Sequence, residues 1–325
     1  MLRTMRPLLL LAPLCLALPL GAATDRPLKS FPEAQLKEAP AGSEVLFVVS
    51  GDNRPTAQGA PLPPVLKTIF AEIGLIRPDF VIWTGDTVYG SCDSREELEY
   101  QAFAAAAAPI AGTVPLFNAP CQPYGSFDLA GAHFIALHTD GAADAISGTQ
   151  LAWLKRDLES NKGARAIFVF THTKLNNSLQ DLFRRYSVKA VFSGHEHISR
   201  YVVVRLVGDK VSYDVIEPGR LSLEIAPSVQ NEARLWIVNS NDTAQPLPIR
   251  GIEIEPPLTP KRCEGLIATA ALKKGDAWVL LDGVTVDGCA VTGGALRLHV
   301  KVPPLPQGSV LVTVRRNGTD GRPVS

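Results

Sequence analysis

Hydrophobic residues in the first two thirds of the chain follow two alternating patterns. Short apolar runs, typical of strands buried on both faces, occur within residues 45–49, 78–90, 114–120, 133–140, 165–173 and 189–197. Segments with apolar residues at helical spacing, or rich in strong helix formers, lie at 62–75, 94–112, 149–161 and 178–187. Strands that alternate with helices in this way predict an α/β fold whose sheet is covered on both faces.

The pattern changes near Glu217–Gly219. From there on, apolar and polar residues alternate with period two in short segments separated by Gly, Pro and Asn, at 220–227, 233–241, 249–256, 277–283, 295–302 and 309–318. No segment of this region favours a helix. Regular short strands over about a hundred residues are typical of a β-sandwich. We therefore expect an α/β domain at 44–219 and a C-terminal β-sandwich domain at 220–325.

The N-terminus has the features of a secretory signal. Arg3 and Arg6 precede an apolar stretch from Leu8 to Leu20, and small residues follow up to Ala23. We expect a signal peptide at 1–23, then a polar, proline-bearing linker at 24–43, and hence a periplasmic or secreted protein. A retained anchor helix is the alternative, while a lipid anchor at Cys15 fits less well. No later stretch is long and apolar enough to cross a bilayer, so we expect no membrane span after cleavage.

Composition narrows the class of partner. The 325 residues carry a formal net charge of +0, which argues against nucleic-acid binding because such proteins usually have a basic excess. Export would leave an even number of cysteines in an oxidising compartment. Pairing by region gives Cys92–Cys121 and Cys263–Cys289, although the other two pairings, or four free thiols, stay open.

Five residues suited to metal binding follow the ends of predicted strands. They are Asp52, Asp86, His172, His195 and His197. In α/β proteins, ligand sites assemble at the carboxyl edge of the sheet. Imidazole and carboxylate side chains form a nitrogen and oxygen donor set. Such a set suits Zn, Fe or Mn rather than a metal bound by thiolates.

The segment 191–200, VFSGHEHISR, raises a more detailed expectation. His195 and His197 stand at i and i+2, so on an extended chain both side chains would point the same way. Gly194 before them is expected to allow a sharp turn.

These motifs resemble those of the calcineurin-like metallophosphoesterases over residues 45–205, in the order that family shows. SGDNRP (50–55), WTGDTVYG (83–90), FVFTHT (168–173) and FSGHEH (192–197) look like its ligand motifs. YGSFDLAGAHFIAL and QLAWLKRDL are similar to stretches of secreted bacterial members. Four ordered motifs are far more specific than one. The resemblance implies two central sheets flanked by helices, here followed by the C-terminal β-sandwich.

The resemblance also implies a dinuclear centre that hydrolyses phosphate esters, in which two divalent or trivalent ions of Fe, Zn or Mn clamp the phosphate and activate a water. Carried over residue by residue, Asp86 bridges the ions, Asp52, Tyr89 and His197 hold one, and Gln122, His172 and His195 hold the other. The implied partner is a phosphorylated small molecule: a monoester, a diester, a nucleotide or a phospholipid head group.

Two motifs depart from the family pattern. Many members have Asp-x-His in the first motif, where this chain has Arg54. Purple acid phosphatases also lack that histidine and use the tyrosine of a GDxxY motif, which residues 85–89 match. Tyr89 is therefore expected to be a ligand, with simple packing beside the site as the alternative.

The third motif is degenerate, because Cys121, Gln122 and Pro123 stand where the family has GNH. Gln122 could ligate in place of the asparagine, and Asn118 is the other amide nearby. The motif's histidine is missing, so Arg54, His138 or Lys174 would have to take its part as an acid or anion-stabilising group. The alternative is a metallophosphoesterase-like binding module that no longer turns over.

The remaining histidines and their neighbours are expected to be structural. His133 and His299 should pack within strands, and Arg200 with Tyr201 should brace the loop after His197. His138 and Asp140, at another strand end, are less favoured substrate contacts.

Overall fold

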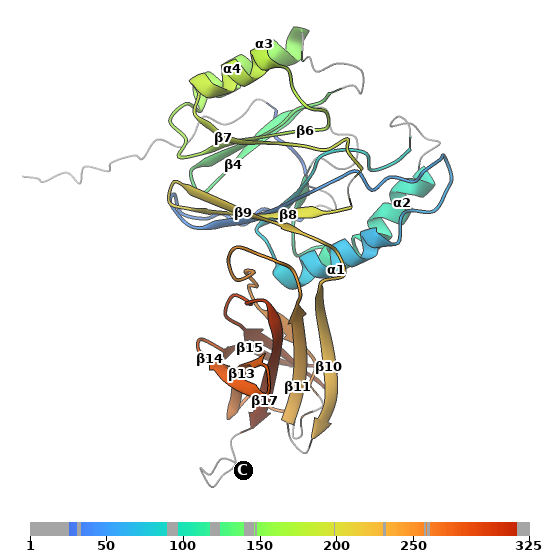
Figure 1. Cartoon of the computed structure of the whole chain (residues 1–325), viewed down its shortest axis with the longest axis vertical. Coiled ribbons are helices and arrows are strands. Elements are labelled where there is room, and N and C mark those ends of the chain that lie inside the picture. The colour runs from blue at the N-terminus through green and yellow to red at the C-terminus, as the bar shows by residue number, and fades with distance from the viewer. Residues whose placement is uncertain are drawn as a thin grey trace, which may run out of the picture.

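The computed structural model describes residues 26–30, 34–89, 97–117, 124–139, 146, 148–197, 199–229, 232–256, 258 and 261–316. Over these ranges the protein is a mixed α/β structure with several sheets and few helices (Figure 1). The expected signal peptide at 1–23 lies outside the described residues. Among those described, no helix has the length and apolar character needed to span a bilayer.

Two facing sheets form the first part of the molecule. The first has the order β3 (Leu116–Phe117), β2 (Phe80–Trp83), β1 (Val45–Ser50), β8 (Tyr201–Val207) and β9 (Lys210–Ile216). The second has the order β4 (Gly125–Leu129), β5 (Ala132–Ala136), β6 (Ile167–Thr171) and β7 (Val188–Ser193). Strands β1 and β2 pair in parallel, and so do β5, β6 and β7. Within each parallel set the carboxyl ends of the strands therefore lie at the same edge of the sheet.

Phenylalanine rings fill the space between the two sheets. The Phe80 ring centroid lies 4.9 Å from that of Phe134 and 5.0 Å from that of Phe127. Phe47 packs edge-on against Phe168 at 5.2 Å. Edge-to-face contacts of this kind add to the free energy gained from burying the rings.

Helices cover the outer faces. α1 (Val65–Ile76) and α2 (Glu97–Ala106) pack on the five-stranded sheet, and α3 (Gly148–Ser160) and α4 (Asn177–Arg185) on the four-stranded sheet (Figure 1). The helix expected at 94–112 is divided, because α2 ends at Ala106 and a 3₁₀ turn, η2, spans Ala108–Ile110. Pro109 lacks an N–H and cannot continue the α-helix.

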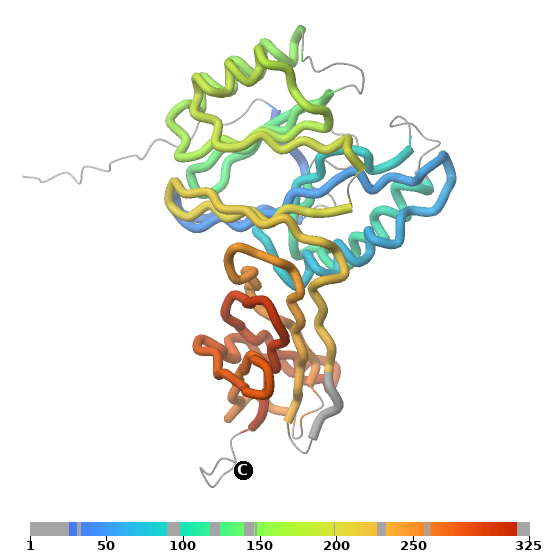
Figure 2. Tube along the Cα trace, viewed as in Figure 1, coloured from blue at the N-terminus to red at the C-terminus, as the bar shows by residue number. Residues whose placement is uncertain are grey.

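Several strands were missing from the sequence-based expectation. β4, β8, β9, β13 and β15 lie where no strand was predicted. β9 illustrates the reason, since its sequence KVSYDVI mixes polar and apolar residues and most of its positions are exposed. Figure 2 shows β8 and β9 returning beside the N-terminal strand β1.

Only strands occur among the described residues after Leu221, as the period-two pattern predicted. One sheet has the order β10 (Leu221–Val229), β11 (Glu232–Asn239), β17 (Gly308–Arg316), β13 (Leu266–Lys274) and β14 (Ala277–Leu281). The other has the order β12 (Ile252–Ile254), β16 (Ala295–Lys301) and β15 (Thr285–Thr292). Their apolar faces share one core. The predicted disulfide Cys263–Cys289 is confirmed, whereas Cys92 and Cys121 lie outside the described residues.

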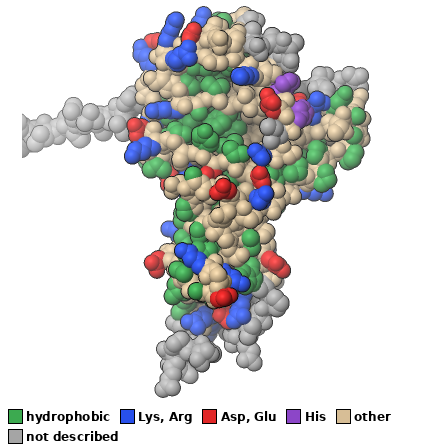
Figure 3. All heavy atoms as spheres, viewed as in Figure 1, with side chains coloured by type: hydrophobic (Ala, Val, Ile, Leu, Met, Phe, Trp, Pro, Cys, Tyr) green, Lys and Arg blue, Asp and Glu red, His purple; other side chains and the backbone are tan. Residues whose placement is uncertain are grey.

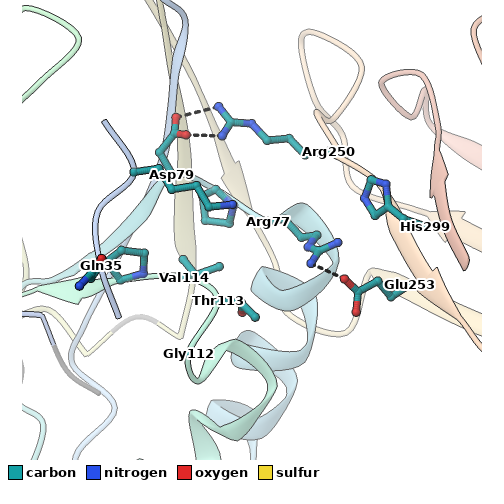
Figure 4. Close-up of a pocket in the computed structure, with 12 residues that line it drawn as sticks. Gln35, Arg77, Asp79, Gly112, Thr113, Val114, Arg250, Glu253 and His299 are labelled. Atoms are coloured by element: carbon teal, nitrogen blue, oxygen red, sulfur yellow. Dashed lines mark hydrogen bonds and ion pairs between the residues drawn. The ribbon is translucent and has the colours of Figure 1, made fainter. Parts of the chain in front are cut away.

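Charged residues join the two parts of the molecule. Arg250 pairs with both carboxylate oxygens of Asp79, with Nη2 2.7 Å from Oδ2, and Arg77 Nη2 lies 2.8 Å from Glu253 Oε1 (Figure 4). These four side chains line a polar cavity of about 420 Å³ at the junction. The segment before β12 is thereby fixed to the end of α1.

A buried glutamate strengthens the same junction. Glu72 of α1 accepts hydrogen bonds from the Tyr201 hydroxyl at 2.9 Å, the Gly219 amide at 2.8 Å and the Leu221 amide at 3.0 Å. Burial raises the pKa of Glu72 against the effect of these bonds. Tyr201 therefore connects the start of β8 to α1. Arg200 pairs with Glu217 at 3.0 Å, and both contacts hold the segment that leads into β10.

Candidate metal centre

The five Asp and His residues expected to bind metal all follow strands, and the structure brings them to one end of the two sheets. Asp52 comes after β1, Asp86 after β2, His172 after β6, and His195 and His197 after β7. Figure 3 shows histidine side chains gathered beside acidic ones on one side of the first part of the molecule. Both sheets therefore contribute to the site.

Asp52, Asp86 and His172 form its centre. Each offers one ligand atom, and these atoms all lie within 4.8 Å of one another. His172 Nδ1 lies 3.5 Å from Asp52 Oδ1, and His172 Nε2 lies 3.7 Å from Asp86 Oδ1. Two carboxylates and one imidazole at this spacing are a donor set for a transition metal. These three residues could hold one ion.

His195 and His197 extend this group from the loop after β7. His195 Nδ1 lies 3.3 Å from His172 Nε2, and the His195 amide donates a 2.8 Å hydrogen bond to Asp52 Oδ1. His197 Nε2 lies 2.9 Å from Asp86 Oδ2. Both imidazoles are exposed, whereas the three central residues are half-buried, so the histidines lie between the triad and solvent.

The backbone at four of these positions is left-handed. The φ angles are 59° at Asp52, 50° at Asp86, 77° at His195 and 48° at His197. The expectation that the two histidines share one face of an extended chain was therefore wrong: they approach different partners from a tight loop. Such a conformation costs of order 1–3 kcal/mol for each non-glycine residue and is concentrated at functional sites.

Glycines make room for the ligand side chains. A Cβ on Gly194 would stand 2.6 Å from Asp52 Oδ1, and a Cβ on Gly85 would stand 2.8 Å from His172 Nδ1. A Cβ on Gly51 would collide with the Thr84 hydroxyl. Gly194 was expected to provide a turn, but it is needed for close approach instead, and the positive φ falls on His195.

The surroundings set the charge and orientation of the donors. Burial raises the pKa of Asp52, although the His195 amide and the nearby His172 act to lower it. A bound cation would offset the cost of keeping that carboxylate charged. The Thr84 carbonyl accepts a 3.1 Å hydrogen bond from His172 Nδ1, which leaves the Nε2 lone pair facing Asp86 and His195.

Arg54 and Tyr89 lie beside Asp86. Arg54 Nε is 2.8 Å from Asp86 Oδ2, and the Arg54 guanidinium carbon is 4.9 Å from the centroid of the Tyr89 ring. The Tyr89 amide donates a 2.7 Å hydrogen bond to Glu99, which also accepts from the Gly59 amide at 2.9 Å. Tyr89 thus contacts the site through Arg54, and its role as a direct ligand stays a prediction.

Sequence reasoning missed Thr84 and Glu99. Both are buried, at 4% and 6% exposed. Thr84 could have been suspected from its place before Gly85-Asp86. Nothing in the sequence links Glu99 to Tyr89, because the two are ten positions apart and share no motif.

Other candidates are placed differently. Gln122, Asn118, Pro123 and Asp140 lie outside the described residues. The backbone amide of His138 bonds the Gln150 side chain at 2.8 Å, and Lys174 is exposed. His133 lies fully buried in β5, as expected, and His299 lies in β16, where it pairs with Asp287.

Comparison with known proteins adds no assignment: no family model matches the chain, and no curated protein matches it.

Proposed function

We propose that the protein is a metal-dependent hydrolase of phosphate esters of the calcineurin-like metallophosphoesterase type, with an active site centred on Asp52, Asp86 and His172. The observation that carries this proposal is the convergence of these three side chains within 4.8 Å at the ends of three separate strands. The order of the four motifs along the chain supports it further. Two facing sheets flanked by helices are consistent with the fold that the resemblance implies.

A second ion would be held by the outer donors. Asp86 suits a bridging role, because its Oδ1 faces His172 while its Oδ2 faces His197. His195 adds a donor beside His172, and Tyr89 and Gln122 would complete the two shells. Bound Fe, Zn or Mn would supply an electrophile for the phosphoryl oxygens and a water of lowered pKa.

The chain's own residues would orient the substrate. Arg54, stacked on Tyr89 and bonded to Asp86, presents a guanidinium at the edge of the site, where it can donate hydrogen bonds to a phosphate. With the GNH histidine absent, the proton for the leaving group has to come from water or from an exposed group such as His138 or Lys174. Esters with good leaving groups are therefore expected to react fastest.

A non-catalytic binding module is the second candidate, and one contact favours it. Arg54 occupies Asp86 Oδ2 at 2.8 Å, so a fixed positive charge already neutralises the carboxylate proposed to bridge the ions. An Arg–carboxylate pair of this kind could maintain the loop geometry without metal turnover. The two candidates differ in whether a metal-loaded protein hydrolyses esters.

We also propose export to the periplasm or the exterior. The signal-like N-terminus and the disulfide Cys263–Cys289 both suit an oxidising compartment. The substrate would then be a phosphorylated small molecule outside the cytosol.

The test is hydrolysis of p-nitrophenyl phosphate and bis-p-nitrophenyl phosphate by the full chain loaded with Mn, Zn or Fe. We expect slow turnover that falls to the background rate in His195→Ala, because the centre loses one of its donors. Asp209→Ala is the matched control, because Asp209 is exposed in the β8–β9 turn at the opposite end of the sheet. Equal, background-level rates in wild type and His195→Ala, with metal bound in both, would instead establish the binding module.

A further inference from the structure

The five-stranded sheet extends beyond the four-stranded sheet that covers it. Along one row of its inner face, Phe80, Phe47 and Val204 are fully buried, but Tyr213, the next residue in register, is 64% exposed. In the neighbouring row, Val49 is 5% exposed and Val215 is 47% exposed. The inner face is thus covered on β2, β1 and β8, whereas on β9 it is covered at Val211 and uncovered at Tyr213 and Val215.

Ring contacts between the sheets explain this difference. Phe80 of β2 packs under Phe127 of β4 and Phe134 of β5. Phe47 of β1 packs under Phe168 of β6 and reaches Phe192 of β7 at 6.3 Å. The last strand of the smaller sheet therefore lies near β1 and β8, and among the described residues no fifth strand lies over β9.

The free edge of β7 borders the uncovered area. Within the described part of the chain β7 pairs only with β6. Ala190 and Phe192 on its inner face are half-buried, whereas their partners on β6, Phe168 and Phe170, are fully buried. Figure 3 shows hydrophobic side chains exposed where Figure 1 places β7 and β9. A free sheet edge beside exposed apolar side chains is a site for strand pairing, and Lys189 is the one charged side chain on β7.

We propose that an extended segment of a partner protein adds to β7 as a fifth, antiparallel strand. Its alternate side chains would be apolar and would cover Tyr213 and Val215, while its backbone would pair with the free edge. Antiparallel pairing is chosen because it is the more stable of the two.

Charge at one end defines the segment further. β7 and β9 run in the same direction, because β9 is antiparallel to β8, β8 is antiparallel to β1, and the ends of β1 and β7 meet at Asp52 and His195. The exposed Lys189 of β7 therefore lies at the end remote from the metal centre. An antiparallel strand would place its C-terminal end there, so this end carries carboxylates.

A second copy of the chain fits less well than such a segment. The β7 sequence VKAVFS contains no carboxylate to face Lys189 of the other copy. Self-pairing of two β7 strands would also place the β9 strands of both copies on the same side of the joined sheet, where neither covers Tyr213 and Val215 of the other.

The experiment titrates the full chain into a labelled peptide of alternating Thr and Val that ends in two Glu residues, and follows fluorescence polarisation. We expect saturable binding, slower amide exchange over 188–193, and affinity about tenfold weaker in Tyr213→Lys and Val215→Lys. Ser212→Lys is the matched control, since it adds the same charge to the opposite face of β9. A peptide ending in two Lys should bind more weakly than the Glu peptide.

Three results would overturn the proposal: no binding of the Glu peptide, equal loss in Ser212→Lys and Tyr213→Lys, or a dimer of the chain alone whose 188–193 amides are protected. The last result would assign the surface to a second copy. Unchanged thermal unfolding of each lysine variant shows that lost binding does not reflect a lost fold.

Discussion

At the scale of single residues, the candidate site depends on pairs in which a glycine precedes a candidate ligand. Gly51, Gly85 and Gly194 stand directly before Asp52, Asp86 and His195. Each glycine leaves space for a neighbouring side chain, and each following residue adopts a left-handed φ. The strain is maintained because the preceding strands β1, β2 and β7 fix the chain where these turns begin.

Gly194→Ala tests this arrangement. The new Cβ would stand 2.6 Å from Asp52 Oδ1 and 2.9 Å from Thr84 Oγ1, so Asp52 must move and lose its bond from the His195 amide. We expect the free energy of unfolding to fall by about 1–3 kcal/mol, together with weaker metal binding. Chemical denaturation and metal titration measure both effects.

Gly163→Ala is the control, because a Cβ there meets nothing within 4 Å. If Gly194→Ala unfolds and binds metal as Gly163→Ala does, the close approach of Gly194 to Asp52 is not a requirement of the site.

At the scale of elements, the buried side chain of His133 connects β5 to β4 and to α3. Its ring in β5 lies 2.6 Å from Asp128 of β4 and 2.7 Å from Asp157 of α3. Burial by itself lowers the pKa of His133, but the hydrogen bonds to the two carboxylates outweigh it and raise the pKa to about 9. Sequence reasoning placed this histidine within a strand and missed both partners, since they come from separate elements.

This pKa predicts a pH dependence of stability. Because the folded pKa lies above the ordinary value of 6.5, the stabilisation by His133 is fully present below pH 6.5 and is lost as the pH rises through about 9. Over that window, wild type should lose about 3 kcal/mol more free energy of unfolding than His133→Gln. Urea unfolding at several pH values measures the difference, and parallel curves for the two proteins would show that His133 is not charged when folded.

The elements themselves differed in how far the sequence could predict them. Runs such as 45–49 and 167–171 are buried on both faces, and their continuous apolar character was sufficient. β9 lies at a sheet edge and most of its positions are exposed. Its sequence therefore lacks the continuous apolar run that marks a buried strand. The end of α2 was mispredicted at Gly112, because the run of alanines before Pro109 favours a helix by its own propensity.

At the scale of the whole molecule, the candidate metal-binding residues lie together at one end of the paired sheets. Strand order places Asp52, Asp86, His172, His195 and His197 there, and this convergence could be anticipated because ligand residues at strand ends share an edge. The contacts that complete it could not: Arg54 with Tyr89, and Thr84 with His172, depend on loop conformations that no spacing encodes.

The most direct test of the account is the metal content of the purified full chain after loading with Mn, Zn or Fe and removal of free ion. We predict roughly one to two ions per chain in wild type and in Asp209→Ala, and a loss of most of this metal in Asp86→Ala and His172→Ala. No bound metal in wild type, or the same content in all four proteins, would contradict the assignment of this cluster as a metal centre.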